Sequence, residues 1–115
     1  APHVGAIAAR LEDEDGDVRS AACFALGELG AHAAPHAGAI AARLEDEDTD
    51  LRRAACTLLC KLGAHAAPHA GAIAVRLEDE DSNVRGTACV ALSELGAHAA
   101  PHAGAIAVRL EDEDS

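Results

Sequence analysis

The sequence predicts an all-α domain, an alpha-alpha superhelix (solenoid) in which 33-residue units of two helices stack on one another. Three observations lead to this prediction. The chain aligns with itself at an offset of 33 residues along its whole length. Alanine, which has the highest helix propensity, is abundant, and Phe24 is the only aromatic residue. Within each unit, the apolar residues recur with helical spacing.

The repeat divides the chain into near-copies. Residues 34–48, 67–81 and 100–114 are almost identical, and residues 1–15 differ from residues 34–48 only at Val4. We expect a single domain over residues 1–115, with repeats at 1–33, 34–66 and 67–99 and a half repeat at 100–115. One pair of helices cannot bury its apolar face alone, so the units must stack. Seven helices are predicted.

The first helix of the second unit is predicted over about residues 35–45. Pro35 suits its first turn, where a missing N–H breaks no hydrogen bond. Its apolar residues follow the spacing i, i+3, i+4, i+7 and therefore share one face: Ala37, Ile40, Ala41 and Leu44.

The second helix of the first unit is predicted over about residues 16–29. Asp15 or Gly16 can cap its start, and Asp17 in the first turn favours the helix dipole. Its expected apolar face consists of Val18, Ala22, Ala25, Leu26 and Leu29. The glycines Gly30, Gly63 and Gly96 follow the second helices, where a residue with positive φ often ends a helix.

The acidic turn and the second helix together carry a family resemblance. The string DEDGDVRSAACFALGELG, with its two copies, resembles the short HEAT-like repeats of the phycobilisome-lyase type and the pattern of artificial α-helical repeat binders. The resemblance implies a protein–protein interaction scaffold whose second helices line the concave surface. The chain departs from the pattern at Glu14, Glu47 and Glu80, where a turn proline is common, and at Cys23, Cys56 and Cys89, where alanine is usual.

The three second helices differ mainly along one stripe, which is a candidate surface for a protein partner. Its positions are spaced i, i+4, i+7, i+8, opposite the apolar face. The candidate residues are Ser20, Phe24, Glu28, Arg53, Thr57, Cys60, Lys61, Gly86, Val90, Ser93 and Glu94; Gly27 also belongs to the stripe. Neutral divergence at exposed positions explains the same variation equally well.

The charge distribution excludes some partners. The net charge of −11 argues against nucleic acid, which requires Lys and Arg to neutralise phosphates. No apolar run approaches the roughly 18 residues that would span a membrane. Sixteen of the twenty acidic residues lie in four EDED turns, which predict one acidic edge. That edge either attracts a basic partner or loosely binds divalent cations, or it is simply solvated.

The cysteines, histidines and arginines are predicted to be structural. Four cysteines without a CxxC pair indicate reduced, half-buried thiols and a cytoplasmic location. The histidine pairs, at HxxxH spacing but broken by glycine and proline, do not predict a metal site. No cofactor is expected. We expect Arg19, Arg52 and Arg85 to pair with acidic residues of the Asp13 or Asp15 type, including those of neighbouring repeats.

A protein-binding scaffold, not an enzyme, is therefore the leading hypothesis, because near-copies offer no asymmetric pocket of unlike groups. Three alternatives remain. The chain resembles the HEAT-like phycobilin lyases and could be a subunit of such an enzyme. It could self-assemble through uncapped ends, since the predicted last helix, Gly104–Leu110, copies the internal ones. It could also be an engineered or consensus repeat protein without a natural partner.

Overall fold

The structure is a computed structural model that describes residues 3–96, and within this range it contains helices and no strand. The first helices of the units have six residues each: α1 (Val4–Ala9), α3 (Ala37–Ala42) and α5 (Ala70–Val75). The second helices have fourteen each: α2 (Gly16–Leu29), α4 (Thr49–Leu62) and α6 (Ser82–Leu95). The seventh predicted helix and the half repeat lie outside the described residues.

Short 3-10 helices connect the α-helices. The segments that follow the first helices are η1 (Arg10–Glu12), η3 (Arg43–Glu45) and η5 (Arg76–Glu78). Those that follow α2 and α4 are η2 (Gly30–His36) and η4 (Gly63–His69). None of the helices in residues 3–96 is long and apolar enough to cross a membrane.

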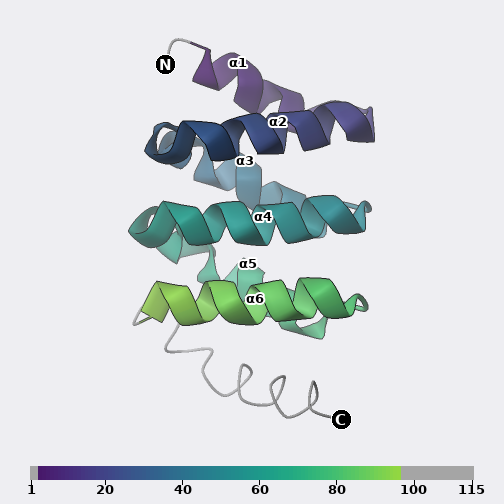
Figure 1. Ribbon diagram of the computed structural model, residues 1–115, viewed down its shortest axis with the longest axis vertical. Helices are drawn as coiled ribbons and strands as arrows, with labels where there is room; N and C mark the ends of the chain where they lie inside the picture. Colours follow the sequence, from purple (N-terminus) through teal and green to yellow (C-terminus); the bar gives the residue numbers. More distant parts are fainter. Residues whose placement is uncertain (1–2, 97–115) are drawn as a thin grey trace.

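The helices form two layers. Figure 1 shows α2, α4 and α6 side by side in front. Behind them, α3 lies between the levels of α2 and α4, and α5 between those of α4 and α6, while α1 lies beyond α2 at the N-terminal end. One layer therefore presents only second helices to the outside, and its outer side is here called the second-helix face.

The predicted bounds of the first helix were too wide. Pro35 lies inside η2, and α3 begins only at Ala37. His36 has φ −107° and ψ 17°, outside the range of a regular α-helix, so α3 begins only after it. At the other end the chain tightens into η3, because Asp46 takes an extended conformation with ψ 146°.

The predicted bounds of the second helix were correct. The carboxylate of Asp15 accepts a hydrogen bond from the backbone N–H of Asp17 at 2.8 Å, and Asp48 and Asp81 cap α4 and α6 in the same way. The glycine after each second helix has positive φ, with φ 57° and ψ −125° at Gly63. This ψ lies outside the left-handed α region that asparagine can adopt, so the position requires glycine.

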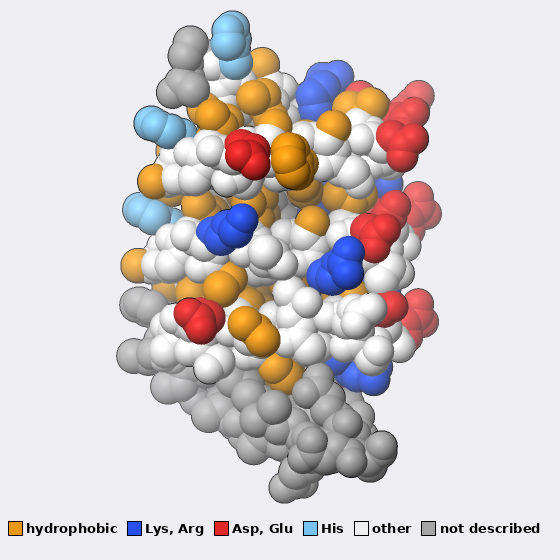
Figure 2. Space-filling view, in the orientation of Figure 1, with side chains coloured by type: hydrophobic (Ala, Val, Ile, Leu, Met, Phe, Trp, Pro, Cys, Tyr) orange, Lys and Arg blue, Asp and Glu red, His pale blue; other side chains and the backbone are white. Residues whose placement is uncertain are grey.

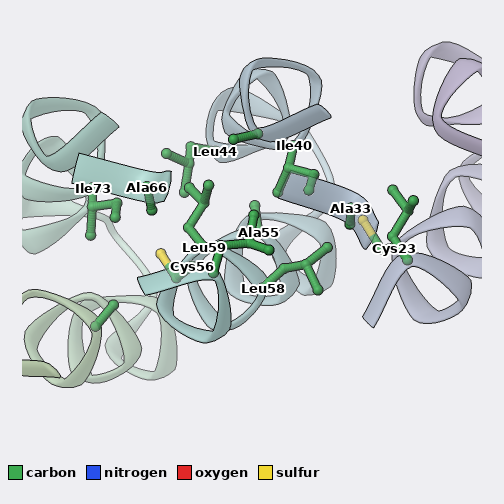
Figure 3. Close-up of a cluster of buried hydrophobic side chains, with 14 of the residues drawn as sticks. Cys23, Ala33, Ile40, Leu44, Ala55, Cys56, Leu58, Leu59, Ala66 and Ile73 are labelled. Carbon is green, nitrogen blue, oxygen red and sulfur yellow. The ribbon is translucent and has the colours of Figure 1, made fainter. Parts of the chain in front are cut away.

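The core lies between the two layers. Figure 3 shows Ile40 and Leu44 pointing from the first-helix layer toward Ala55 and Leu59 of α4. All four side chains are buried, as are the equivalent residues of the next unit, Ile73, Leu77, Ala88 and Leu92. Alanine at the helix contact allows a close approach between layers, and the leucines fill the remaining space.

We predict that Gly63→Ala destabilises the protein by about 1–2 kcal/mol, because the new Cβ is strained at positive φ. Gly38→Ala is the matched control. Gly38 lies in α3 and has open space around the position of a Cβ, so this change should leave stability equal or raise it by up to about 1 kcal/mol. Urea unfolding followed by circular dichroism measures both. Equal losses of stability in the two variants would contradict the conclusion that position 63 requires glycine.

Candidate protein-binding face

The stripe predicted from the sequence lies on the second-helix face. Most of its residues are exposed: Ser20, Phe24, Glu28, Arg53, Thr57, Lys61, Val90, Ser93 and Glu94. Three are half-buried, namely Gly27, Cys60 and Gly86. Phe24 has 72% of its surface exposed and Val90 59%, whereas the neighbouring core residues are below 10%. The face therefore combines polar residues with two apolar side chains that pack against little of the described chain.

A groove runs between α2 and α4 on this face. It encloses about 420 Å³. Its floor is apolar and its rim carries charges; the lining residues are Ser20, Cys23, Phe24, Gly27, Glu28, Asp50, Arg53, Ala54, Thr57, Leu58 and Lys61. Six of the eleven predicted partner-binding residues thus border one groove. Gly86 and Val90 border a different hollow, beside Ser82, Asn83 and Thr87.

The floor of the groove depends on a contact between Gly27 and Leu58. Figure 3 shows Leu58 extending from α4 toward the chain segment that carries Cys23. A Cβ placed on Gly27 would lie 3.3 Å from Cδ1 of Leu58, so glycine leaves just enough room for the leucine. Glycine at position 27 therefore leaves space for the Leu58 side chain between α2 and α4.

Charges of both signs surround the groove. Arg53 lies 3.4 Å from Asp50 in an exposed ion pair, and the Asp50 side chain is 80% exposed. Glu28 and Lys61 occupy equivalent positions near the other end. Figure 2 shows basic side chains over α4, with acidic side chains over α2 and α6 and along the edge formed by the acidic turns.

Buried ion pairs hold successive repeats together and thereby position this face. Arg19 of α2 donates from Nε to Asp46 Oδ2 at 2.9 Å and from Nη2 to Asp46 Oδ1 at 3.2 Å. Its Nη1 donates to the backbone oxygen of Asp13 in its own repeat. Arg52 makes the equivalent contacts: its Nε and Nη2 donate to the carboxylate of Asp79, and its Nη1 donates to the backbone oxygen of Asp46. We call each such arginine and the aspartate of the following repeat a clamp.

The aspartate of each clamp is fully hydrogen-bonded although its side chain is only 2% exposed. Asp46 also accepts from Nη1 of Arg43 at 2.9 Å and from the backbone N–H of Asp48. Burial alone would raise the pKa of Asp46, but the Asp48 N–H, Arg19 and Arg43 outweigh it and hold the pKa below its ordinary value. Burial is likewise outweighed at Asp79, by Arg52, the Asp81 N–H and Arg76, so its pKa is also lowered.

The expected pairing of the arginines is thus confirmed for Arg19 and Arg52, with the Asp13-type residue of the next repeat as partner. Arg85 donates to the backbone oxygens of Asp79 and Glu80. Its equivalent aspartate would be residue 112, which lies outside the described residues.

The acidic edge is less uniform than the sequence indicated. The second residue is buried in two of the EDED turns, as Asp46 and Asp79, and half-buried in the first, as Asp13; the fourth residue of each described turn caps the following helix. The first and third residues, such as Glu45 and Glu47, are exposed. About half of the carboxylates in these turns therefore have structural roles, and the exposed glutamates give the edge its negative field.

Three cysteines are more deeply buried than predicted. Cys23, Cys56 and Cys89 are at most 6% exposed, because they lie where adjacent second helices pack together; Cys60 is half-buried. Burial raises the pKa of Cys23 to about 11 and that of Cys56 to about 12. Burial, and then the nearby Glu94, also raises the pKa of Cys60. The raised pKa values of Cys23, Cys56 and Cys60 disfavour the reactive thiolate at these three positions.

The histidines lie at the edge opposite the acidic turns (Figure 2). His32 and His65 are exposed, and His36 and His69 are half-buried within η2 and η4. Within residues 3–96, no three His, Cys, Asp or Glu side chains gather in a way that could hold a metal ion.

Sequence reasoning missed several contributors to the site. Arg43 and Arg76 complete the clamps, and their invariant place three residues before Asp46 and Asp79 was an available signal. Leu58 and Ala54 of the groove floor were not identified from the sequence, since contacts between α2 and α4 cannot be inferred from either helix alone.

Two-helix units in register, joined by repeated contacts, define a tandem-repeat protein. Comparison with known families agrees: the family described as HEAT repeats matches residues 4–70 and, in a second overlapping match, residues 37–114. The chain therefore belongs to the HEAT-repeat family. None of the curated proteins matches it.

We predict that Asp46→Asn lowers the free energy of unfolding by about 3 kcal/mol, because Arg19 and Arg43 lose their common buried counter-charge. Asp13→Asn is the matched control at the equivalent position. The Asp13 side chain is 23% exposed, pairs with the exposed Arg10 at 3.3 Å and accepts a hydrogen bond from the Asp15 N–H, which asparagine can also accept, so a loss below about 1 kcal/mol is expected. Chemical unfolding of both variants tests this; similar losses would show that the clamp contributes little.

Acid should destabilise the protein through the same two aspartates. A carboxyl group whose pKa is lowered in the folded state stabilises the fold above its unfolded pKa of about 3.9. This contribution disappears as the pH falls through the folded pKa. We expect the difference in unfolding free energy between the wild type and the Asp46→Asn, Asp79→Asn double variant to shrink steadily from pH 5 to pH 2. A difference independent of pH would contradict this explanation.

Proposed function

We propose that the chain is an α-solenoid scaffold that binds a partner protein through its second-helix face. HEAT repeats are commonly protein-interaction scaffolds and generally not enzymes, and we assign no reaction to this chain. The observation that carries the proposal is the exposed Phe24 beside the groove between α2 and α4.

Phe24 supports this proposal because its exposure has no evident structural benefit. It is the only aromatic residue in the chain, and the equivalent positions carry Thr57 and Val90. Aromatic side chains next to a groove are typical anchors of protein interfaces. The polar and charged residues around it, Glu28, Arg53 and Lys61, would form the rim that such an anchor requires.

The face is also rigidly held. The clamps fix the spacing of α2, α4 and α6, so a partner would meet a surface that is already ordered in the free protein. A preformed surface avoids part of the entropy lost on binding. The repeat residues that form the clamps are constant, whereas the variation among copies is concentrated on this face.

Phe24→Ala should weaken binding of a partner isolated with the wild-type chain by about 30-fold, which corresponds to about 2 kcal/mol for an aromatic anchor. Val75→Ala is the matched control, since Val75 is an apolar residue with 56% exposure on a first helix. The control should change the dissociation constant less than twofold. Isothermal titration calorimetry compares the two variants. A partner that is insensitive to Phe24→Ala, or more sensitive to Val75→Ala, would refute the proposal.

A further inference from the structure

We infer that the partner segment recognised by the groove between α2 and α4 is a basic amphipathic helix. This inference rests on the proposed function and adds the chemical class of the partner. Three properties of the described chain support it: the shape of the groove, the balance of exposed charge, and the position of the carboxylates at the two ends of the groove.

The groove has the shape that a helix requires. It follows two fourteen-residue helices, which are each about 21 Å long at 1.5 Å per residue. Its floor consists of Cys23, Gly27, Ala54 and Leu58, and Phe24 forms an apolar part of its rim. A helix laid in such a groove places one apolar face against the floor and leaves its polar side chains to the rim.

The exposed charges favour a basic partner. The chain carries a net charge of −11. Arg19, Arg52, Arg43 and Arg76 are committed to the buried aspartates and do not contribute free cations to the surface. A second copy of the chain would bring another eleven negative charges to the face, so it is a poor occupant. A cationic segment is attracted over distances of about 8–10 Å at physiological salt.

The carboxylates lie at both ends of the groove. Asp50, in the first turn of α4, marks one end, and Glu28, near the end of α2, marks the other. Asp50 occupies the repeat position of Asp17 in α2, so the two carboxylates are eleven positions apart along a second helix. Eleven residues correspond to about 16 Å along the helix axis. A docked helix with lysine or arginine about three turns apart, on either side of its apolar residues, can reach both.

The two cations at the groove do not reverse this preference. Arg53 already pairs with Asp50. Lys61 lies at the repeat position of Glu28 across the groove, so the charges lining that end balance, and the preference for a cation comes from the net charge of −11. Lys61 therefore opposes a basic ligand, and its removal should strengthen binding. Whether the removal of Lys61 strengthens or weakens binding therefore distinguishes a basic from an acidic partner.

The test uses a fluorescently labelled fourteen-residue peptide of leucine and lysine with helical spacing, titrated with the full chain at about 150 mM salt. A peptide with glutamate in place of lysine is its counterpart, and a lysine–leucine peptide of scrambled spacing controls for simple charge attraction. We expect the basic amphipathic peptide to bind at least tenfold more tightly than either of the others, as measured by fluorescence anisotropy.

Variants of the chain then locate the site. Glu28→Gln should weaken binding of the basic peptide about threefold and Lys61→Gln should strengthen it about threefold, as expected for exposed charge pairs. Phe24→Ala should weaken it about tenfold or more. Glu12→Gln, on the acidic edge, and Val75→Ala should each change it less than twofold.

The inference is overturned if no peptide binds, if the acidic peptide binds as well as the basic one, or if Lys61→Gln weakens binding. It is also overturned if Glu12→Gln and Phe24→Ala have equal effects, which would indicate adhesion to the acidic edge. If the basic peptide fails while an isolated partner still depends on Phe24, the proposed function stands and only the class of partner is wrong. If Phe24→Ala does not change the affinity for an isolated partner, the proposed function itself fails.

Discussion

The buried contact between an arginine of one repeat and an aspartate of the next sets the geometry of the molecule. Arg19 donates at the same time to the backbone of its own acidic turn and to the carboxylate of Asp46 in the following repeat. A single guanidinium group thus fixes the shape of one turn and the position of the next. Alanine and leucine faces could slide against each other with small cost, whereas a forked ion pair with fixed hydrogen-bond directions permits one register. Since burying two charges costs desolvation energy, the clamp contributes geometry more than net stability.

The clamp explains the form of the first helices and of the acidic turns. Asp46 and Asp79 must turn inward in an extended conformation, so the first helices cannot continue and end in 3-10 segments. Two residues later, Asp48 and Asp81 cap α4 and α6. The alternation of glutamate and aspartate in each turn matches these roles, because the shorter aspartate occupies both structural positions. The longer glutamates remain in solvent and provide the negative edge.

The bounds of the second helices could be predicted from the residues at their ends, whereas the contacts between repeats could be predicted only in part. Asp15 and Gly30 delimit α2 by themselves, and both predicted bounds were correct. The first helix was misjudged because proline is equally compatible with the 3-10 segment in which it lies. The sequence predicted exposure of the stripe from helical periodicity, but it could not reveal the groove, which requires Leu58 of α4 to fit against Gly27 of α2. The choice of Asp46 as the partner of Arg19 likewise depends on how repeats stack.

The same division explains how a chain of near-copies can present a specific surface. The clamp residues must be identical in every repeat, because each serves two repeats, and a change at one affects both. Positions 24 and 28 and their equivalents are exposed and take no part in the clamps, so Phe24, Thr57 and Val90, or Glu28, Lys61 and Glu94, can differ while the clamps stay the same. Selectivity for a partner can therefore arise from single substitutions on a constant framework. For the partner that we propose, the exposed aromatic ring and the net negative charge of the chain would together favour an apolar, positively charged segment over a neutral or acidic one.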